Sequence, residues 1–160
     1  MLDILKAQYA MVQSARIALL NYCATVSETD FVKPLPGFVN KSMRDLLLHV
    51  ANTYRSWLGR IAQGQPYPIH EPATVPDVAT LRELFQEIDG LVASFCAAID
   101  EDDWQLTEEI TVASLDRPLR LTPLEVFMHI ITHEFHHKGQ VLTMSRQLGY
   151  TPVDTDVIRF

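Results

Sequence analysis

A histidine-rich segment near the C-terminus, residues 122–149, constrains the fold of this chain more than any other stretch. It contains four of the six histidines, namely His129, His133, His136 and His137. Thr122 and Glu125 have the spacing of a helix-capping box, and Pro123 stands where the first turn of a helix tolerates proline. Gly149 supplies a stop. Between these ends, apolar residues recur at helical spacing: Leu124, Phe127, Met128, Ile131, Phe135, Leu142 and Leu148. The segment therefore predicts a helix of about seven turns.

Two of these histidines have the spacing of a metal-binding pair. His133 and His137 are four residues apart, so on a helix they share a face, with Cβ atoms about 5–6 Å apart. His129 lies one turn before them, and Gln140 continues the same polar stripe. Clustered histidines can also simply face solvent or sit hydrogen-bonded in a core. A metal site is favoured because the polar stripe borders an apolar one and a further histidine is available on another predicted helix.

Length and charge limit the classes of protein to consider. A chain of 160 residues predicts one domain, residues 1–160. Its net charge of −7 argues against binding to nucleic acid or to anionic membranes, since both rely on Lys and Arg. No apolar run is long enough for a transmembrane helix. Cys23 and Cys96 do not form a C-x-x-C pair, and with no recognisable secretion signal they indicate a reducing cytoplasm and buried, unreactive thiols.

The rest of the chain predicts three more long helices. Amphipathic patterns cover residues 3–26, 42–62 and 77–100, separated by proline-containing connections at residues 27–41 and 64–76. Residues 106–121 contain two β-prone runs around a turn, which favours a minor β-hairpin before the last helix. We therefore expect an all-α protein, a four-helix bundle whose long connections include one or two crossovers.

The second predicted helix carries the histidine that could complete the metal site. Ser42 and Asp45 have the spacing of its N-terminal cap. Its inward stripe is expected to include Leu46, Thr53, Trp57 and Ile61, with His49 within it or at its edge. An imidazole there needs a polar partner, because a buried polar group without one is costly. His49 is either a hydrogen-bonded core residue or a third ligand for the pair formed by His133 and His137.

Residues 133–137 also match the zinc-protease motif H-E-x-x-H, in which a glutamate activates water. The surrounding sequence disfavours this interpretation. The extended motif needs glycine and histidine where this chain has Gln140 and Thr143, and no glutamate follows Glu134 as a further ligand. Glu134 is also rotated about 100° from His133 on a helix, which places it on a different face. A zinc protease is kept as a minor alternative.

The pattern His129-x-x-x-His133-Glu-x-His136-His137-Lys-Gly-Gln140 strongly resembles the signature of the DinB/YfiT-like superfamily. The pattern Asp45-Leu-Leu-x-His49, the order of elements and the ending Gln147-Leu-Gly149-x-x-Pro152 are similar to that family as well. The resemblance implies a bacterial four-helix bundle that forms homodimers and holds a divalent metal with three histidines. Carried onto this chain, those ligands are His49, His133 and His137, while His136 points elsewhere. Members of the family are described as metal-dependent hydrolases or as transferases that use small thiols.

Three functions remain open on these grounds. Three neutral imidazoles leave open positions on a metal, which suits a metal-dependent enzyme acting on a small molecule by hydrolysis or by transfer of a low-molecular-weight thiol. Alternatively, the ion braces the bundle without catalysis, or the histidines bind no metal and the chain is an interaction module. Imidazole suits zinc, nickel, copper and iron, and manganese is a further candidate. Asp45, His129 and Gln140 are candidates for orienting a ligand or contacting a bound molecule.

Overall fold

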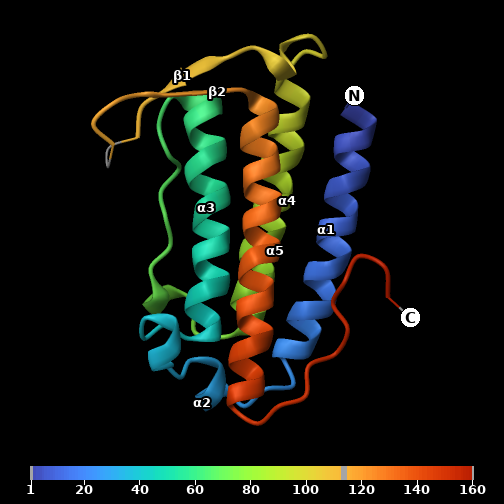
Figure 1. Cartoon of the computed structure of the whole chain (residues 1–160), viewed down its shortest axis with the longest axis vertical. Helices are drawn as coiled ribbons and strands as arrows, with labels where there is room; N and C mark the ends of the chain where they lie inside the picture. Colours follow the sequence, from blue (N-terminus) through green and yellow to red (C-terminus); the bar gives the residue numbers. More distant parts are fainter. Residues whose placement is uncertain (1, 113–114, 160) are drawn as a thin grey trace.

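Four long helices form the body of the protein, as the sequence predicts. The computed structural model describes residues 2–112 and 115–159. Its long helices are α1 (Leu2–Cys23), α3 (Met43–Gln63), α4 (Val78–Ala98) and α5 (Pro123–Gln147), and a short helix, α2 (Glu28–Phe31), follows α1. Three 3-10 turns lie in the connections, at Pro36–Phe38, Pro72–Thr74 and Asp103–Gln105. The prediction of an all-α bundle is confirmed (Figure 1).

Side-chain caps explain where the two histidine-bearing helices begin. The Ser42 hydroxyl accepts from the Asp45 backbone N–H, and the Asp45 carboxylate accepts in return from the Ser42 backbone N–H. Thr122 and Glu125 form the same reciprocal box at the start of α5. At the other end of α5, Gly149 adopts a φ of 91°, a left-handed conformation that favours glycine. Each capping box satisfies backbone donors that a helix start leaves unpaired.

In the part of the chain that the structure describes, the bundle contains one full-length crossover. Helices α1 and α5 run in one direction, and α3 and α4 run in the opposite direction (Figure 1). The connection 64–77 therefore returns along the whole length of α3 before α4 begins. Asn52 of α3 holds this connection through two hydrogen bonds of 2.8 Å with the main chain of His70. A Cβ atom at Gly59 would stand 2.4 Å from the backbone nitrogen of Tyr67, so glycine is required for this close approach.

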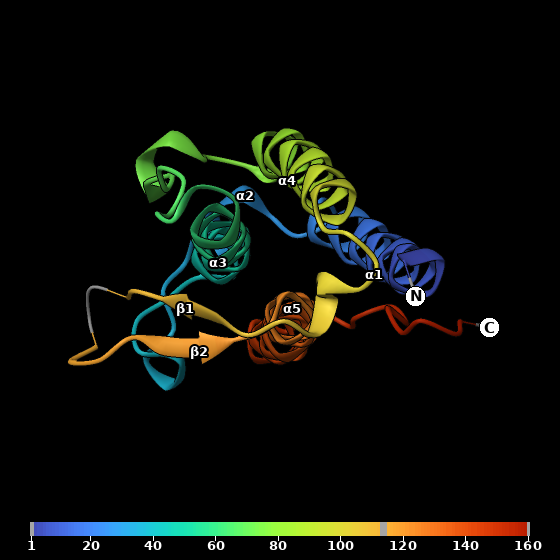
Figure 2. The ribbon, with the colours of Figure 1, turned by 90° about the horizontal axis from the view of Figure 1, so that it is seen from above.

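A small hairpin follows α4 and precedes α5 in the chain, and it lies beside α3 and α5 at one end of the bundle (Figure 1 and Figure 2). Strand β1 (Glu108–Ile110) pairs antiparallel with β2 (Leu119–Leu121), and Glu108 stands opposite Leu121. This confirms the predicted hairpin; part of its connection, residues 113–114, lies outside the described residues.

The core runs the length of the four helices. Its largest fully buried side chains include Trp104, Tyr54 and Phe127, and the Trp104 ring contacts Phe127 edge-on. The opposite end is closed by α2 and the segment after it, where Phe31 and Leu35 are buried. Both cysteines are buried free thiols, in agreement with the sequence. Burial raises the pKa of Cys23 to about 12, which keeps this thiol protonated at neutral pH.

The C-terminal segment packs back on the body. Lys138 of α5 is 7% exposed, and its Nζ donates to the backbone oxygen of Thr155 at 2.7 Å. Thr155 itself is buried. None of the described helices is long and apolar enough to cross a membrane.

Candidate metal centre

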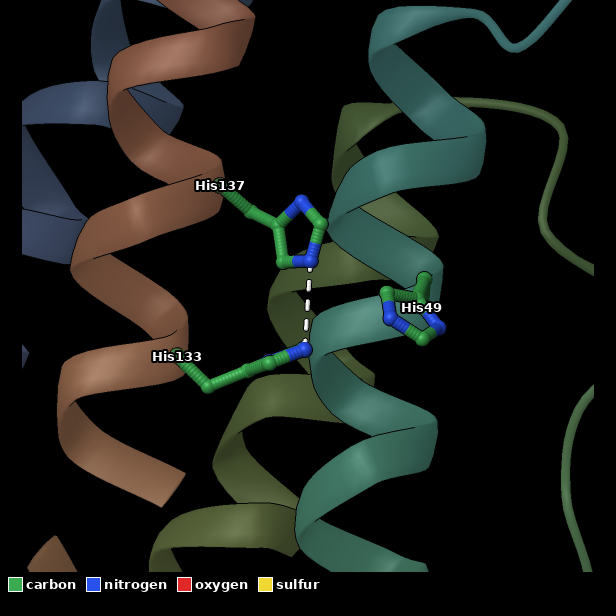
Figure 3. Close-up of side chains that lie close together, drawn as sticks. All are labelled: His49, His133 and His137. Atoms are coloured by element: carbon green, nitrogen blue, oxygen red, sulfur yellow. Dashed lines mark hydrogen bonds between the residues drawn. The ribbon is translucent and has the colours of Figure 1, made fainter. Parts of the chain in front are cut away.

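Two neighbouring antiparallel helices, α3 and α5, bring the three predicted ligands together. His49 lies in the second turn of α3, and His133 and His137 lie one turn apart on the face of α5 that meets it (Figure 3). Each residue offers one ring nitrogen, and these three nitrogens lie within 4.8 Å of one another. Within residues 2–112 and 115–159 they form the one group of three or more His, Cys, Asp or Glu donors this close together.

The spacing of the two histidines on α5 suits a single ion. Their Nε2 atoms lie 3.1 Å apart. Two nitrogens about 2.1 Å from one metal are roughly 3.0–3.4 Å apart at octahedral or tetrahedral angles. His49 is the most exposed of the three, with its ring centroid 5.0 Å from that of His133 and 4.9 Å from that of His137. The donor set therefore fits a divalent ion that retains open positions.

Gln140 fixes the orientation of His137. Its Oε1 lies 2.7 Å from Nδ1 of His137, and because an amide oxygen only accepts, that Nδ1 carries a proton. Nε2 of a neutral His137 is then a lone-pair donor directed at the group. Metal-binding histidines ordinarily have such a hydrogen-bond partner for the ring nitrogen that does not bind the metal, here Nδ1. Nδ1 of His133 is buried and has no such partner among the described residues.

Electrostatics keep the three imidazoles neutral at pH 7. Burial, followed by the neighbouring histidines, lowers the pKa of His133 to about 4. Burial also lowers the pKa of His137, against an opposing effect of the Gln140 hydrogen bond. For His49, burial and then the charge of Lys41 act in the same direction. A neutral imidazole is the form that binds a metal, so the site is prepared for an ion without a prior loss of protons.

Two further candidate residues lie beside the group. The ring of His129 is 5.6 Å from that of His133 and 5.2 Å from that of Trp57, centroid to centroid. Asp45 uses its Oδ2 in the helix cap and its Oδ1 to accept from Arg44 at 2.9 Å, and no bond from it to His49 occurs among the described residues. Orientation of a ligand by His129 or Asp45 stays a prediction.

Glu134 lies on a different face of α5 from the two histidines, in the core. It is 6% exposed and accepts two hydrogen bonds from Arg16, at 2.7 and 2.8 Å, and one from the Tyr54 hydroxyl, at 2.6 Å. The H-E-x-x-H mechanism needs this carboxylate beside the histidines, where it would activate water. Here it serves as the counter-ion of a buried arginine. The geometry therefore argues against the zinc-protease alternative.

The partner of Glu134 is a feature that our sequence analysis missed. Arg16 of α1 is 4% exposed and also donates to Asp89 of α4 at 2.6 Å, so it links three helices. The sequence carried a signal of this burial. Arg16 stands four residues after Val12 and four before Leu20, on the apolar side of α1. A charged residue at such a position is almost never buried without a partner.

A cavity of about 470 Å³ opens beside the histidines. His49, His137 and Gln140 line it from the two helices. Its remaining wall comes from the start of α3 (Asp45 and Leu46) and from the loop before it, residues 37–39 and Lys41. The sequence indicated a connection here but not its position beside the site. A molecule in this cavity would meet two of the candidate ligands, His49 and His137, directly.

Fold and site together define a helical-bundle protein with a candidate three-histidine metal centre. The DinB family model matches residues 1–160, and the chain belongs to the DinB family.

Individual relatives are distant. The chain is similar to YizA of Bacillus subtilis (strain 168), described as an uncharacterized protein, with 22% identity over 137 residues that cover 86% of this chain and 83% of YizA. A DinB-like protein of Bacillus cereus ATCC 10987 superposes with a TM-score of 0.66 and 16% identity, covering 94% of this chain and 93% of the other. The DinB-like protein YjoA of Bacillus subtilis gives 0.62 and 16%, covering 92% and 97%. At this identity the two structures establish the shared fold alone.

Proposed function

We propose that this DinB protein binds one divalent metal ion through His49, His133 and His137 and uses it to act on a small molecule, by hydrolysis or by transfer of a small thiol. The observation that carries the proposal is the convergence of three neutral imidazoles beside a cavity of about 470 Å³. A structural metal site is ordinarily closed by four protein ligands, whereas a catalytic one keeps a position for water or substrate.

The three histidines and Gln140 would each have a separate role in holding the ion. His133 and His137 present their Nε2 atoms from one rigid helix, and Gln140 holds the ring of His137 in the required tautomer. His49 closes the group from α3. A bound ion would supply Lewis acidity, which lowers the pKa of a water or a thiol at its open position. The cavity gives such a molecule room beside His49 and His137.

An ion that only braces the bundle is a weaker explanation. Helices α3 and α5 are already joined on their core side by the 2.6 Å hydrogen bond between Tyr54 and Glu134. Any ion bound to the folded state would stabilise it, so stabilisation alone does not separate the two functions. Access to the ion does separate the two functions, because an ion that only braces the bundle needs no open coordination position.

The first test is the metal content of untagged protein. We expect about one ion per chain in the natural sequence and little in a His49→Ala variant. A His136→Ala variant is the matched control, since His136 lies on α5 beside the group but outside it. Retention of metal by the His49→Ala protein would remove His49 from the site, and a natural protein without metal would refute the proposal.

The family resemblance also supports a homodimer, which we propose as the assembly in solution. Light scattering after size-exclusion chromatography should give twice the mass of one chain, and a single-chain mass would refute this.

We further propose a cytoplasmic location, since a reducing compartment suits the two free thiols, Cys23 and Cys96. Fractionation of cells that produce the protein tests this.

A further inference from the structure

The loop before α3 presents a lysine to the cavity beside the histidines. The backbone N–H of Lys41 donates to the oxygen of Phe38, and its carbonyl accepts from the N–H of Leu35, both at 3.0 Å. Between these anchors, Val39 and Asn40 have φ values of 53° and 55°. A β-branched residue in this left-handed region is an outlier that persists only where the surrounding structure imposes it. The main chain of Lys41 is thus held in place at the cavity wall.

Lys41 lines this cavity, and its ammonium has no charged partner among the described residues. It makes no hydrogen bond or ion pair with any of the described residues, and it is exposed. Asp45 also lines the cavity, but both of its oxygens are engaged, one with the Ser42 backbone and one with the Arg44 guanidinium.

Apart from Lys41 and Asp45, the groups that line the cavity are uncharged. Phe38, Val39 and Leu46 supply apolar surface, and Gln140 supplies an amide. A cavity of this kind, mostly apolar with a few directed polar groups, is typical of sites for small molecules. Its one free charge is positive although the chain as a whole carries −7.

We propose that Lys41 selects anionic substrates: the substrate is a small molecule whose metal-binding group reaches the histidines while a carboxylate at its other end pairs with the Lys41 ammonium. This inference rests on the proposed metal-dependent function and names its substrate class. The apolar wall formed by Phe38 and Leu46 would contact the part of the molecule between its two polar ends. Lys41 acts here as a specificity-determining residue and takes no part in bond making.

The test uses protein loaded with Co²⁺ and two small thiols as probes. A thiolate bound to Co²⁺ gives a charge-transfer absorption, which reports binding without any turnover. We compare 3-mercaptopropionate, which is anionic, with 2-mercaptoethanol, which is neutral, and define the preference as the ratio of their dissociation constants. An exposed ion pair supports a preference of about two- to fivefold for the anionic thiol. That preference should shrink as salt is added.

Variants assign the preference to Lys41. Lys41→Met should remove it, and Lys41→Glu should favour the neutral thiol. Lys33→Met is the matched control, because Lys33 is an exposed lysine that does not line the cavity. An unchanged ratio in Lys41→Met would overturn the proposal and leave the metal site intact. Absence of any cobalt–thiolate absorption in the natural protein would instead overturn the open metal site, and this proposal with it.

Discussion

Replacement of Glu134 by Gln distinguishes a buried counter-ion from a catalytic base. In the structure the carboxylate accepts two hydrogen bonds from Arg16, and the two side chains are 6% and 4% exposed. Loss of one charge from a buried pair costs about 3–5 kcal/mol. Arg16 keeps Asp89 as a second counter-ion at 2.6 Å, so we expect the lower end, about 3 kcal/mol. For a domain of this size that is a fall in Tm of roughly 6–12 °C.

The assay is urea denaturation of metal-free protein, so that the result does not depend on an ion. The midpoint should fall in Glu134→Gln while the slope m stays unchanged, as for a mutation that alters stability alone. If Glu134 were a catalytic base instead of a buried counter-ion, its replacement by Gln would leave the free energy of unfolding unchanged. A Glu134→Gln protein as stable as the natural one would refute the assignment of Glu134 to the core.

A double-mutant cycle separates the ion pair from other effects of the substitution. Arg16→Met alone should also destabilise the protein, since it leaves Glu134 buried without its main counter-charge. The double variant Arg16→Met/Glu134→Leu should lose less than the sum of the two single variants, because it buries neither charge. Additive losses would show that the two residues do not interact.

Three further predictions concern the backbone, the histidines and the C-terminal segment. Gly59→Ala should destabilise the protein by about 1–3 kcal/mol, because the new Cβ meets backbone atoms of the crossover connection. Gly90→Ala has open space around it and should stabilise the protein by about 0.5–1 kcal/mol in the same thermal-unfolding assay. Metal-free protein should lose stability as the pH falls from about 6.5 towards 4, because His133, with its pKa lowered to about 4, binds a proton more readily when unfolded. Urea titrations at pH 7 and pH 5 should show a smaller difference in His133→Gln, and an equal difference would contradict this. Lys138→Met should free the segment that Lys138 holds through Thr155, so limited proteolysis should remove the C-terminus first, and resistance equal to the natural protein would count against the anchor.

Local signals in the sequence predicted the framework of the protein. Capping residues such as Ser42 and Thr122 act through their own neighbours, and the structure has both helix starts where these residues predict them. The spacing of His133 and His137 likewise fixes a shared face once the helix forms. No local pattern states which faces of two helices will meet. The expectation that His49 joins this pair therefore came from the family resemblance.

Features that depend on distant parts of the chain were harder to predict. The partner of Glu134 is Arg16, 118 residues earlier, and only the packing of α1 against α5 brings them together. The cavity wall formed by the loop before α3 depends on the left-handed conformation of Val39 and Asn40, and no sequence rule predicts that conformation for a valine. The position of a loop beside a site is decided by such tertiary contacts rather than by composition.

The crossover along α3 has a consequence for how a bound ion would act on the chain as a whole. Because α4 intervenes between the two adjacent helices, His49 and His133 are neighbours in space but 84 residues apart in sequence (133 − 49). An ion joining them closes a loop of that length, for which chain-entropy arguments give a stabilisation of about 4.5 kcal/mol, much like a disulfide bridge. Unlike a disulfide, this cross-link would form in a reducing compartment and be removed by a chelator. The supply of metal would then change the stability of the folded protein.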